Sequence, residues 1–373
     1  MSHRKKPILK TLARADWGMW LGGMYDYNVR SRFQPLPPKL FQLVTNYRCN
    51  SRCIMCNIWQ MPNRHELTVD EFTSIMDPDP IFDGIEQINV SGGEIFLRSD
   101  LVELTGYLLK RLPNLSTFSM VSNGFLPRRI LAQTEAILQL LEARHVRLSM
   151  SISLDGVGTM HDEVRGISGA FEKAQETIDC LQVLQKQHDF WLGSGFVVMH
   201  QNLHLAREFA EWATARHLDY GFQLVGFNAS YVGNLDTQEN IDFRPEDRLA
   251  LISLMQDQAG ERSLTNPHAY YWNDMVRMYR DGAQRTTPCP FAVDGLALDA
   301  YGDVYYCLTT PKIGNVLAEK RSVGAIYYDP ANLHYRAQDM RRGLCLKCSS
   351  ACGTETALKK DFTKFVRFLV AGS

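Results

Sequence analysis

The 373-residue sequence lacks a long hydrophobic run, an excess of charge of either sign and any internal repeat. No uninterrupted apolar stretch reaches about 18 residues, so nothing in the chain reads as a membrane-spanning helix. Because 40 basic and 41 acidic residues leave a formal net charge of -1, the chain has no bulk attraction for nucleic acid. Lys10, Arg14 and Asp16 interrupt the first apolar stretch, which argues against a secretory signal. The sequence therefore predicts a cytoplasmic protein with no nucleic-acid partner.

Cysteine is the residue whose distribution is most informative. Three of the nine cysteines lie near the start, five in the last third, and one stands alone between them. A cytoplasmic protein rarely uses disulfides, so clustered cysteines indicate metal ligands or redox groups. The lone Cys180 lies in a segment of helical spacing and is interpreted as a structural thiol. The distribution predicts two metal sites, one with Cys49, Cys53 and Cys56 and one with ligands among Cys289, Cys307, Cys345, Cys348 and Cys352.

Between residues 40 and 225 the hydrophobic pattern alternates between strand and helix. Strands are predicted at 40–44, 85–90, 117–121, 146–154, 191–199 and 220–225, with a helical segment between each pair. This alternation is typical of βαβ units around a parallel sheet. Six units are fewer than the eight of a closed barrel, so the predicted fold is α/β, a partial (β/α)6 barrel. Ligands bind at the carboxyl ends of such strands, and four of the six predicted strand ends carry a polar or glycine motif.

The first three cysteines follow the first predicted strand with the spacing C-x3-C-x2-C. Three thiolates this close can bind three corners of a [4Fe–4S] cubane and leave the fourth iron open. An open metal position is what a catalytic site needs. The spacing alone also leaves open a zinc site with three local ligands and a distant fourth.

The residues around these cysteines resemble the signature loop of the radical S-adenosylmethionine (SAM) superfamily. Thr45, Asn46 and Asn50 accompany the cysteines in that pattern, and further matches follow in order at the later strand ends. They are Gly92-Gly93-Glu94, Ser122-Asn123-Gly124, Ser153 and Asp155 followed by Arg165, and Asn202. Two positions depart from the family pattern: Ile95 stands where proline is usual, and Met55 where an aromatic residue is frequent.

The resemblance implies a set of cofactors and a binding role for each motif. It names no catalytic acid or base. SAM would chelate the open iron, and one electron would cleave it to a 5′-deoxyadenosyl radical that abstracts hydrogen from an unactivated C–H bond. That electron implies an external reductant such as flavodoxin or ferredoxin. The implied SAM-binding residues are Gly92, Gly93 and Glu94 for the amino group, Ser122 and Asn123 near the ribose and methionine, and Ser153 and Arg165 for the carboxylate.

The C-terminal cysteines resemble the auxiliary-cluster region called SPASM or, in its shortened form, twitch. Cys289 and Cys307 flank short β-hairpin patterns, and a C-x2-C-x3-C run follows. The resemblance implies one auxiliary [4Fe–4S] cluster with four ligands. Cys289, Cys307, Cys345 and Cys348 match the short form, and Cys352 could replace one of them. A zinc knuckle is the alternative, since C-x2-C pairs bind zinc readily.

These patterns predict five segments along the chain. They are a basic N-terminal extension (1–36), the partial barrel (37–228), a helical connecting region (229–285), a small SPASM/twitch-like domain of β-hairpin plus helix (286–355) and an amphipathic C-terminal helix (356–373). The basic, aromatic ends of the chain fit a cap on the domain core as well as a peripheral membrane contact.

The sequence favours a radical SAM enzyme that oxidises or epimerises a small-molecule substrate with the help of the auxiliary cluster. A peptide-modifying (RiPP) maturase is the alternative within this chemistry. The 36 residues before the barrel are few for a separate leader-peptide-binding domain, which weighs against it. A zinc-stapled binding protein is the alternative of another class, and iron, sulfide and zinc analysis of anaerobically prepared protein distinguishes it.

Overall fold

The computed structural model describes residues 17–62, 64–260, 268–351 and 361–371. These residues form two compact units. The barrel unit comprises residues 37–242 and 295–332, and the helical unit comprises the described parts of 1–36, 243–294 and 333–373. No helix in the described ranges is long and apolar enough to cross a bilayer. The five segments predicted from the sequence remain a prediction.

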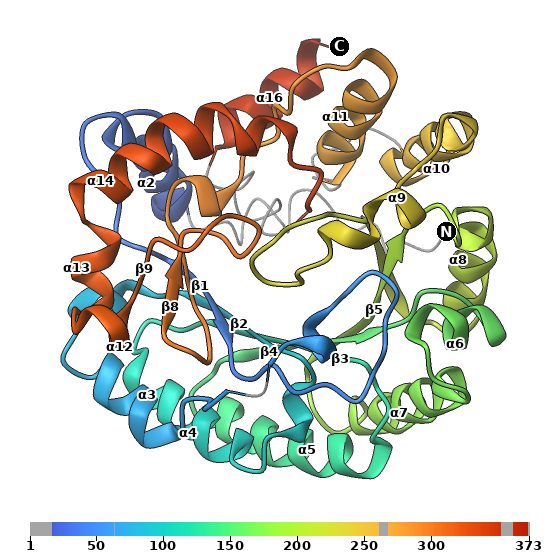
Figure 1. Cartoon of the computed structure of the whole chain (residues 1–373), viewed down its shortest axis with the longest axis horizontal. Helices are drawn as coiled ribbons and strands as arrows, with labels where there is room; N and C mark the ends of the chain where they lie inside the picture. Colours follow the sequence, from blue (N-terminus) through green and yellow to red (C-terminus); the bar gives the residue numbers. More distant parts are fainter. Residues whose placement is uncertain (1–16, 63, 261–267, 352–360, 372–373) are drawn as a thin grey trace. The chain divides into compact units, whose positions relative to one another are not determined.

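A nine-stranded sheet curves through the barrel unit (Figure 1), in the order β6-β5-β4-β3-β2-β1-β7-β8-β9. The first seven strands pair in parallel, and β8 and β9 run antiparallel to their neighbours. Because β6 and β9 stand at the two edges, the sheet is an open partial barrel. The strands are β1 (Leu40–Val44), β2 (Gln87–Ser91), β3 (Thr117–Ser122), β4 (Arg147–Ser153), β5 (Trp191–Val198), β6 (Asp219–Leu224), β7 (Gly295–Leu298), β8 (Asp303–Tyr305) and β9 (Gly314–Asn315).

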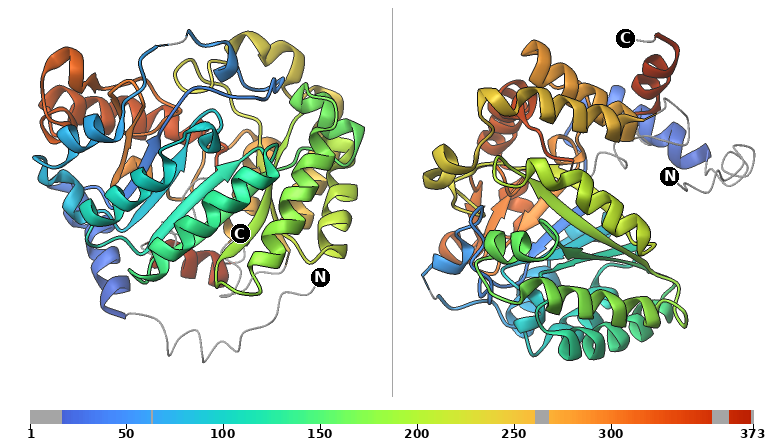
Figure 2. Two further views of the ribbon diagram at one scale, coloured as in Figure 1. Left: turned by 90° about the horizontal axis from the view of Figure 1, so that it is seen from below. Right: turned by 90° about the vertical axis from the view of Figure 1, so that its right-hand side faces the viewer.

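Helices cover the outer face of this sheet, running alongside the strands (Figure 2). Their apolar stripes supply the inner side of that layer; α7, for example, buries Ala174, Ile178 and Leu181. The long ones are α3 (Val69–Met76), α4 (Leu101–Arg111), α5 (Pro127–Glu142), α7 (Ala170–Leu184) and α8 (Ala206–Ala215). Short helices occur at α6 (Thr159–Arg165), α9 (Gln238–Ile241), α12 (Val316–Glu319), α13 (Val323–Tyr327) and α14 (Pro330–Tyr335).

The predicted α/β fold is confirmed. Each of the six predicted strands is present, and no end is displaced by more than two residues. The predicted hairpin is present as β7 and β8, and its first strand extends the barrel sheet by pairing with β1. That pairing was not predicted, because a four-residue strand so far along the chain carries no signal of its partner.

The helical unit contains α2 (Trp17–Asn28), α10 (Arg248–Ala259), α11 (His268–Asp281) and α16 (Phe362–Ala371). Phe365 and Phe368 of α16 are buried against Ala269 and Tyr270 of α11. The apolar side chains of the C-terminal helix that can be described therefore belong to the core of this unit. The basic stretch up to residue 16 lies outside the described residues, and peripheral membrane contact remains a prediction.

Candidate functional site

The predicted motifs follow strands whose carboxyl ends lie at one edge of the barrel sheet. In the register of the sheet, Val44 of β1 lies opposite Ser91 of β2, and Ser122 of β3 lies opposite Ile152 of β4. Because these strands are parallel, the segments that follow them emerge side by side. The cysteine loop (residues 45–57) is the first of these segments.

Backbone hydrogen bonds anchor the cysteine loop on two sides. The amides of Arg52 and Ile54 donate to the carbonyls of Arg165 and Val164 (2.9 and 3.0 Å), at the end of α6. The amide of Asn57 donates to Val232, in the segment after β6 (2.8 Å). These backbone hydrogen bonds therefore fix the conformation of the loop.

The three thiols of this loop form no disulfide. Cys53 is buried, whereas Cys49 and Cys56 are half-buried. Burial raises the pKa of Cys49 to about 11 and that of Cys56 to about 12. Both are therefore neutral thiols near neutral pH until a metal displaces their protons.

The glycines after β2 are required by close backbone packing. A Cβ at Gly92 would collide with Asn46, and one at Gly93 with the carbonyl of Arg48. The amides of Gly93 and Glu94 donate to the carbonyls of Asn46 and Arg48 (2.9 and 2.8 Å). This motif therefore lies directly against the start of the cysteine loop.

Glu94 is a buried carboxylate that joins the ends of β2 and β3. It accepts hydrogen bonds from the Ser122 hydroxyl (2.9 Å), the Asn123 amide (2.7 Å) and the Phe96 amide (3.2 Å). Burial raises its pKa above the usual range. The side chains of Glu94 and Ser122, both predicted to bind SAM, are hydrogen-bonded to each other within the fold. Asn123 instead reaches the cysteine loop, donating to Asn50 Oδ1 (2.7 Å) with its Nδ2 4.0 Å from Cys49 Sγ.

The guanidinium of Arg165 places a positive charge beside the cysteine loop. Its Nη1 lies 3.5 Å from Cys53 Sγ, and its Nη2 forms a 2.6 Å ion pair with the fully buried Asp155 after β4. Burial raises the pKa of the Asp155 carboxyl, and the guanidinium partly offsets this. The Nε of Arg165 is buried without a hydrogen-bond partner among the described residues. The sequence placed Arg165 at the site but did not predict its pairing with Asp155.

Three backbone and side-chain contacts hold Asp155 in place. Its Oδ1 accepts from the Val197 amide (2.8 Å), its amide donates to His161 Nδ1 (3.0 Å), and its carbonyl accepts from Asn202 Nδ2 (3.0 Å). Burial lowers the pKa of His161 to about 2, so its ring is neutral. Ser153, the last residue of β4, is half-buried.

Residues 226–234, here called the clasp segment, fold back over the cysteine loop after β6. The fully buried Asn234 donates from Nδ2 to the carbonyl of Met55, between the second and third cysteines (2.9 Å), and to that of Gly226 (3.0 Å). The hydroxyl of Tyr231 donates to the carbonyl of Gly92 (3.1 Å). Sequence reasoning missed this segment because it treated the chain after β6 as a connector. The polar residues of the clasp that follow the sixth strand were the available signal.

The β7–β8 hairpin supports the same loop. Tyr47 donates its hydroxyl to the buried carboxylate of Asp299 (2.7 Å) and stacks on Tyr301, with ring centroids 4.6 Å apart. Asp299 also accepts from the hydroxyl of Tyr305 (3.2 Å). The hairpin thus fixes the residue two positions before Cys49. These partners lie about 250 residues apart in the chain, which is why no local pattern predicted them.

The later cysteines fall in both units. Cys289, Cys345 and Cys348 lie close enough in the helical unit for their charges to interact, and burial raises the pKa of Cys289 to about 11 and that of Cys345 to about 12. The buried Arg285 lies among them and donates to the carbonyl of Cys348 (2.9 Å). Cys307 follows β8 in the barrel unit, and its place in an auxiliary site remains a prediction. Cys352 lies outside the described residues.

Residues 43–213 match the family described as the Radical SAM superfamily. This match covers a little under half of the chain and makes that segment similar to radical SAM enzymes. The chain is 22% identical over 286 residues to the antilisterial bacteriocin subtilosin biosynthesis protein AlbA of Bacillus subtilis (strain 168), covering 76% of this chain and 56% of AlbA. The matched region thus spans little more than half of that curated relative.

Two solved structures share the fold. SuiB of Streptococcus suis bound to SAM superposes with a TM-score of 0.56 at 13% identity, covering 88% of this chain and 76% of SuiB. The protein anSMEcpe with bound AdoMet and the Cp18Cys peptide superposes with a TM-score of 0.54 at 15% identity, covering 90% and 100%. At these identities the likeness shows the fold alone.

The cysteine loop suits the [4Fe–4S] cluster and the SAM that radical SAM enzymes use. The amide of Ser51 donates to Cys49 Sγ (3.4 Å), and the guanidinium of Arg165 lies beside Cys53, so donors offset the charge of cluster-bound thiolates. No three His, Cys, Asp or Glu side chains in the described part of the chain are close enough to share one metal ion. The unpartnered Nε of Arg165 is a donor that the carboxylate of SAM would satisfy.

We expect Asn234→Ala to weaken retention of this cluster. The carbonyls of Met55 and Gly226 would lose their buried donor, at a cost of about 1–3 kcal/mol. Iron bound per chain after anaerobic reconstitution, and the rate at which a chelator bleaches the cluster, measure the effect. Asn114→Ala is the matched control, because the Asn114 amide donates to an exposed carbonyl, that of Asp83 (2.7 Å). Equal retention in the two variants would show that the clasp segment does not hold the loop.

Proposed function

We propose that this chain modifies a peptide substrate by radical SAM chemistry. The observation that carries the proposal is the extent of the match to AlbA, whose 286 aligned residues exceed the family match at 43–213. The similarity is therefore not confined to the cofactor-binding domain. AlbA is named for the biosynthesis of a bacteriocin, and the neighbouring folds were solved with the precursor peptide SuiA and with the Cp18Cys peptide. A peptide is thus better supported than the small molecule that the sequence analysis ranked first.

In this proposal the residues of the barrel unit bind and orient the cofactors. Cys49, Cys53 and Cys56 hold the cluster, the segment from Gly92 to Glu94 aligns SAM, and Arg165 supplies positive charge between them. When bound, the reduced cluster and SAM supply a radical that abstracts hydrogen from an unactivated C–H bond. The tight packing of the Gly92 segment against the cysteine loop couples the position of one cofactor to that of the other.

Substrate-dependent cleavage of SAM tests the proposal. Anaerobically reconstituted, reduced protein is incubated with SAM and either a size-fractionated peptide pool or a small-metabolite pool. We expect 5′-deoxyadenosine to form faster with the peptide fraction, and to carry deuterium when the peptides are deuterated at carbon. Stimulation by the small-metabolite fraction alone would instead support the small-molecule reading.

An auxiliary [4Fe–4S] cluster belongs to the same proposal. Its support is that Cys289, Cys345 and Cys348 lie near one another, and that the Ser350 amide donates to Cys348 Sγ (3.4 Å), as amides do at thiolate ligands. We expect Cys289→Ala to remove about half of the bound iron while reductive SAM cleavage persists, because each [4Fe–4S] cluster holds four irons. Bound iron is measured in Cys289→Ala and, as the control, in Cys180→Ala, which changes a residue on helix α7 of the barrel unit. An iron content unchanged by Cys289→Ala would refute the auxiliary site.

A further inference from the structure

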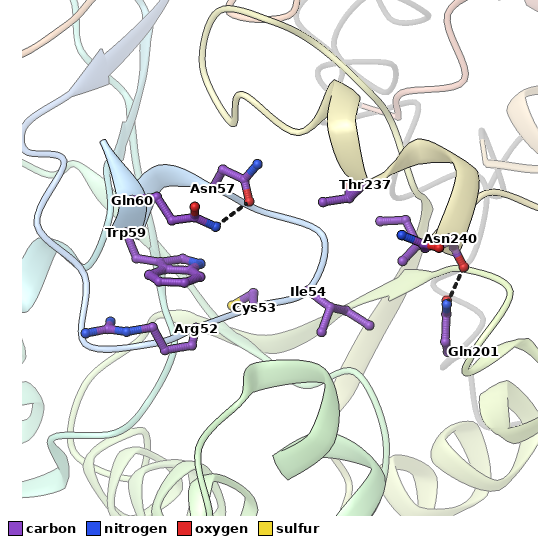
Figure 3. Close-up of a pocket in the computed structure, with 10 residues that line it drawn as sticks. Arg52, Cys53, Ile54, Asn57, Trp59, Gln60, Gln201, Thr237 and Asn240 are labelled. Carbon is purple, nitrogen blue, oxygen red and sulfur yellow. Dashed lines mark hydrogen bonds between the residues drawn. The ribbon is translucent and has the colours of Figure 1, made fainter. Parts of the chain in front are cut away.

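A groove of about 400 Å³ lies beside the cysteine loop in the barrel unit (Figure 3). Cys53 and Ile54 lie at its centre, with Trp59 and Gln60 on one side and Gln201 and Asn240 on the other. Its walls are therefore the cysteine loop with the turn that follows it (Ile58–Gln60), the turn after β5 and the segment after β6. The volume falls within the range of about 300–1,000 Å³ that is usual for ligand sites.

Three side-chain amides of this groove make hydrogen bonds within the protein. Asn57 Nδ2 donates to the Gly233 carbonyl (3.0 Å) and to Asp236 Oδ1 (2.7 Å), and Gln60 Nε2 donates to Asn57 Oδ1 (3.1 Å). Gln201 Nε2 donates to the Asn240 carbonyl (2.6 Å). The Nε2 groups of Gln60 and Gln201 each keep a second N–H, and Gln60 Oε1 accepts no hydrogen bond from the described residues. Gln201 Oε1 is buried without a hydrogen-bond partner among the described residues.

The lining carries almost no free charge. Arg52 is its one charged member among the described residues, and its guanidinium stacks over Trp59, 5.0 Å from the ring centroid. The same group donates to the carbonyls of Cys49 and Ser51 (3.2 and 2.8 Å). A phosphate would find too little positive charge here, and an ammonium group would find no carboxylate. The groove suits a neutral ligand that both donates and accepts hydrogen bonds.

We infer that the groove binds the backbone of an extended peptide, a subsite of the peptide substrate proposed above and dependent on that proposal. A peptide backbone is neutral and carries both kinds of group: its amides would donate to Gln60 Oε1 on one wall, and its carbonyls would accept from the remaining N–H of Gln201 Nε2 on the other. Ile54 and Trp59 offer apolar surface to the side chains between them. Because Cys53 lies at the centre of the groove, a bound peptide would also change the hydrogen bonding and solvent exposure of one cluster ligand.

The test uses the peptide that most strongly stimulates SAM cleavage in the pool experiment, synthesised with a fluorescent label, and the reconstituted full chain. We expect Gln60→Leu and Gln201→Leu each to raise the peptide Kd by about two- to tenfold, the equivalent of one neutral hydrogen bond. Gln182→Leu is the matched control, because Gln182 makes a similar bond to the Arg216 carbonyl (3.1 Å) on an outer helix. Addition of the peptide should also shift the electron paramagnetic resonance spectrum of the reduced cluster in the wild type, and less so in the variants.

Three outcomes decide between the possibilities. A peptide Kd unchanged in both groove variants, with the peptide still processed, overturns the subsite and leaves the proposed function intact. Displacement of the labelled peptide by a neutral polyol, with no peptide turnover, assigns the groove to a small molecule and overturns the inference. The absence of any stimulating peptide overturns the proposed function and the subsite together. Gln60 is exposed, so its variant keeps the test decisive even if Gln201→Leu does not fold.

Discussion

Replacing Cys49, Cys53 or Cys56 by alanine is expected to abolish reductive SAM cleavage. Each substitution removes one of three protein ligands, and the cubane needs all three to keep a single iron open for SAM. The measurement is 5′-deoxyadenosine formed by reduced, reconstituted protein without added substrate, together with iron per chain. We expect the product to fall to background and the iron to fall by about half, because each [4Fe–4S] cluster holds four irons.

Cys180→Ala is the control for this series. Cys180 lies on helix α7 and is half-buried, so its removal should leave both quantities unchanged. Cleavage retained in any one of the three loop variants would place the catalytic cluster elsewhere in the chain.

Asp155→Asn is expected to lower the free energy of unfolding by about 3–5 kcal/mol, the usual cost of leaving one charge of a buried pair uncompensated. Both members are buried: side-chain exposure is 0% for Asp155 and 9% for Arg165. Asparagine keeps an acceptor for the Val197 amide, so the substitution tests the charge rather than the shape. Urea denaturation of the metal-free protein measures the loss.

The exposed pair between Arg216 and Asp179 (3.2 Å) provides the comparison. Asp179→Asn should cost less than about 1 kcal/mol, because solvent screens such pairs. The same Asp155→Asn variant should also bind SAM more weakly, since Arg165 would lose the partner that aims it at the cysteine loop. Equal stability losses at the two sites would show that the Asp155–Arg165 pair is not a buried structural element.

The fold and the position of the candidate site could be predicted because their signals are local. The period-2 and helical patterns predicted the first six of the nine strands, and parallel pairing then placed their polar ends at one edge. The residues that hold the site could not be predicted in the same way. Asp299 supports Tyr47 across some 250 residues of chain, and Asn234 supports Met55 across nearly 180.

The sequence also did not reveal which side chains of the site are free to bind a cofactor. Glu94 and Ser122 were predicted as cofactor ligands from their motifs, yet their side chains bond to each other across neighbouring strands. A motif records which residue types are present. It does not record which of their atoms the fold has already used.

The sequence by itself determined the α/β class, the resemblance to radical SAM enzymes, and the cysteines and strand-end residues available for chemistry, because covalent spacing and hydrophobic period are properties of the chain. Only the tertiary structure decided that Arg165 is paired with Asp155 beside Cys53, that the clasp segment closes on the cysteine loop, and that a groove lined by side-chain amides opens there. These arrangements depend on which segments, distant in the chain, are buried against one another on folding. Such burial is a result of packing in three dimensions.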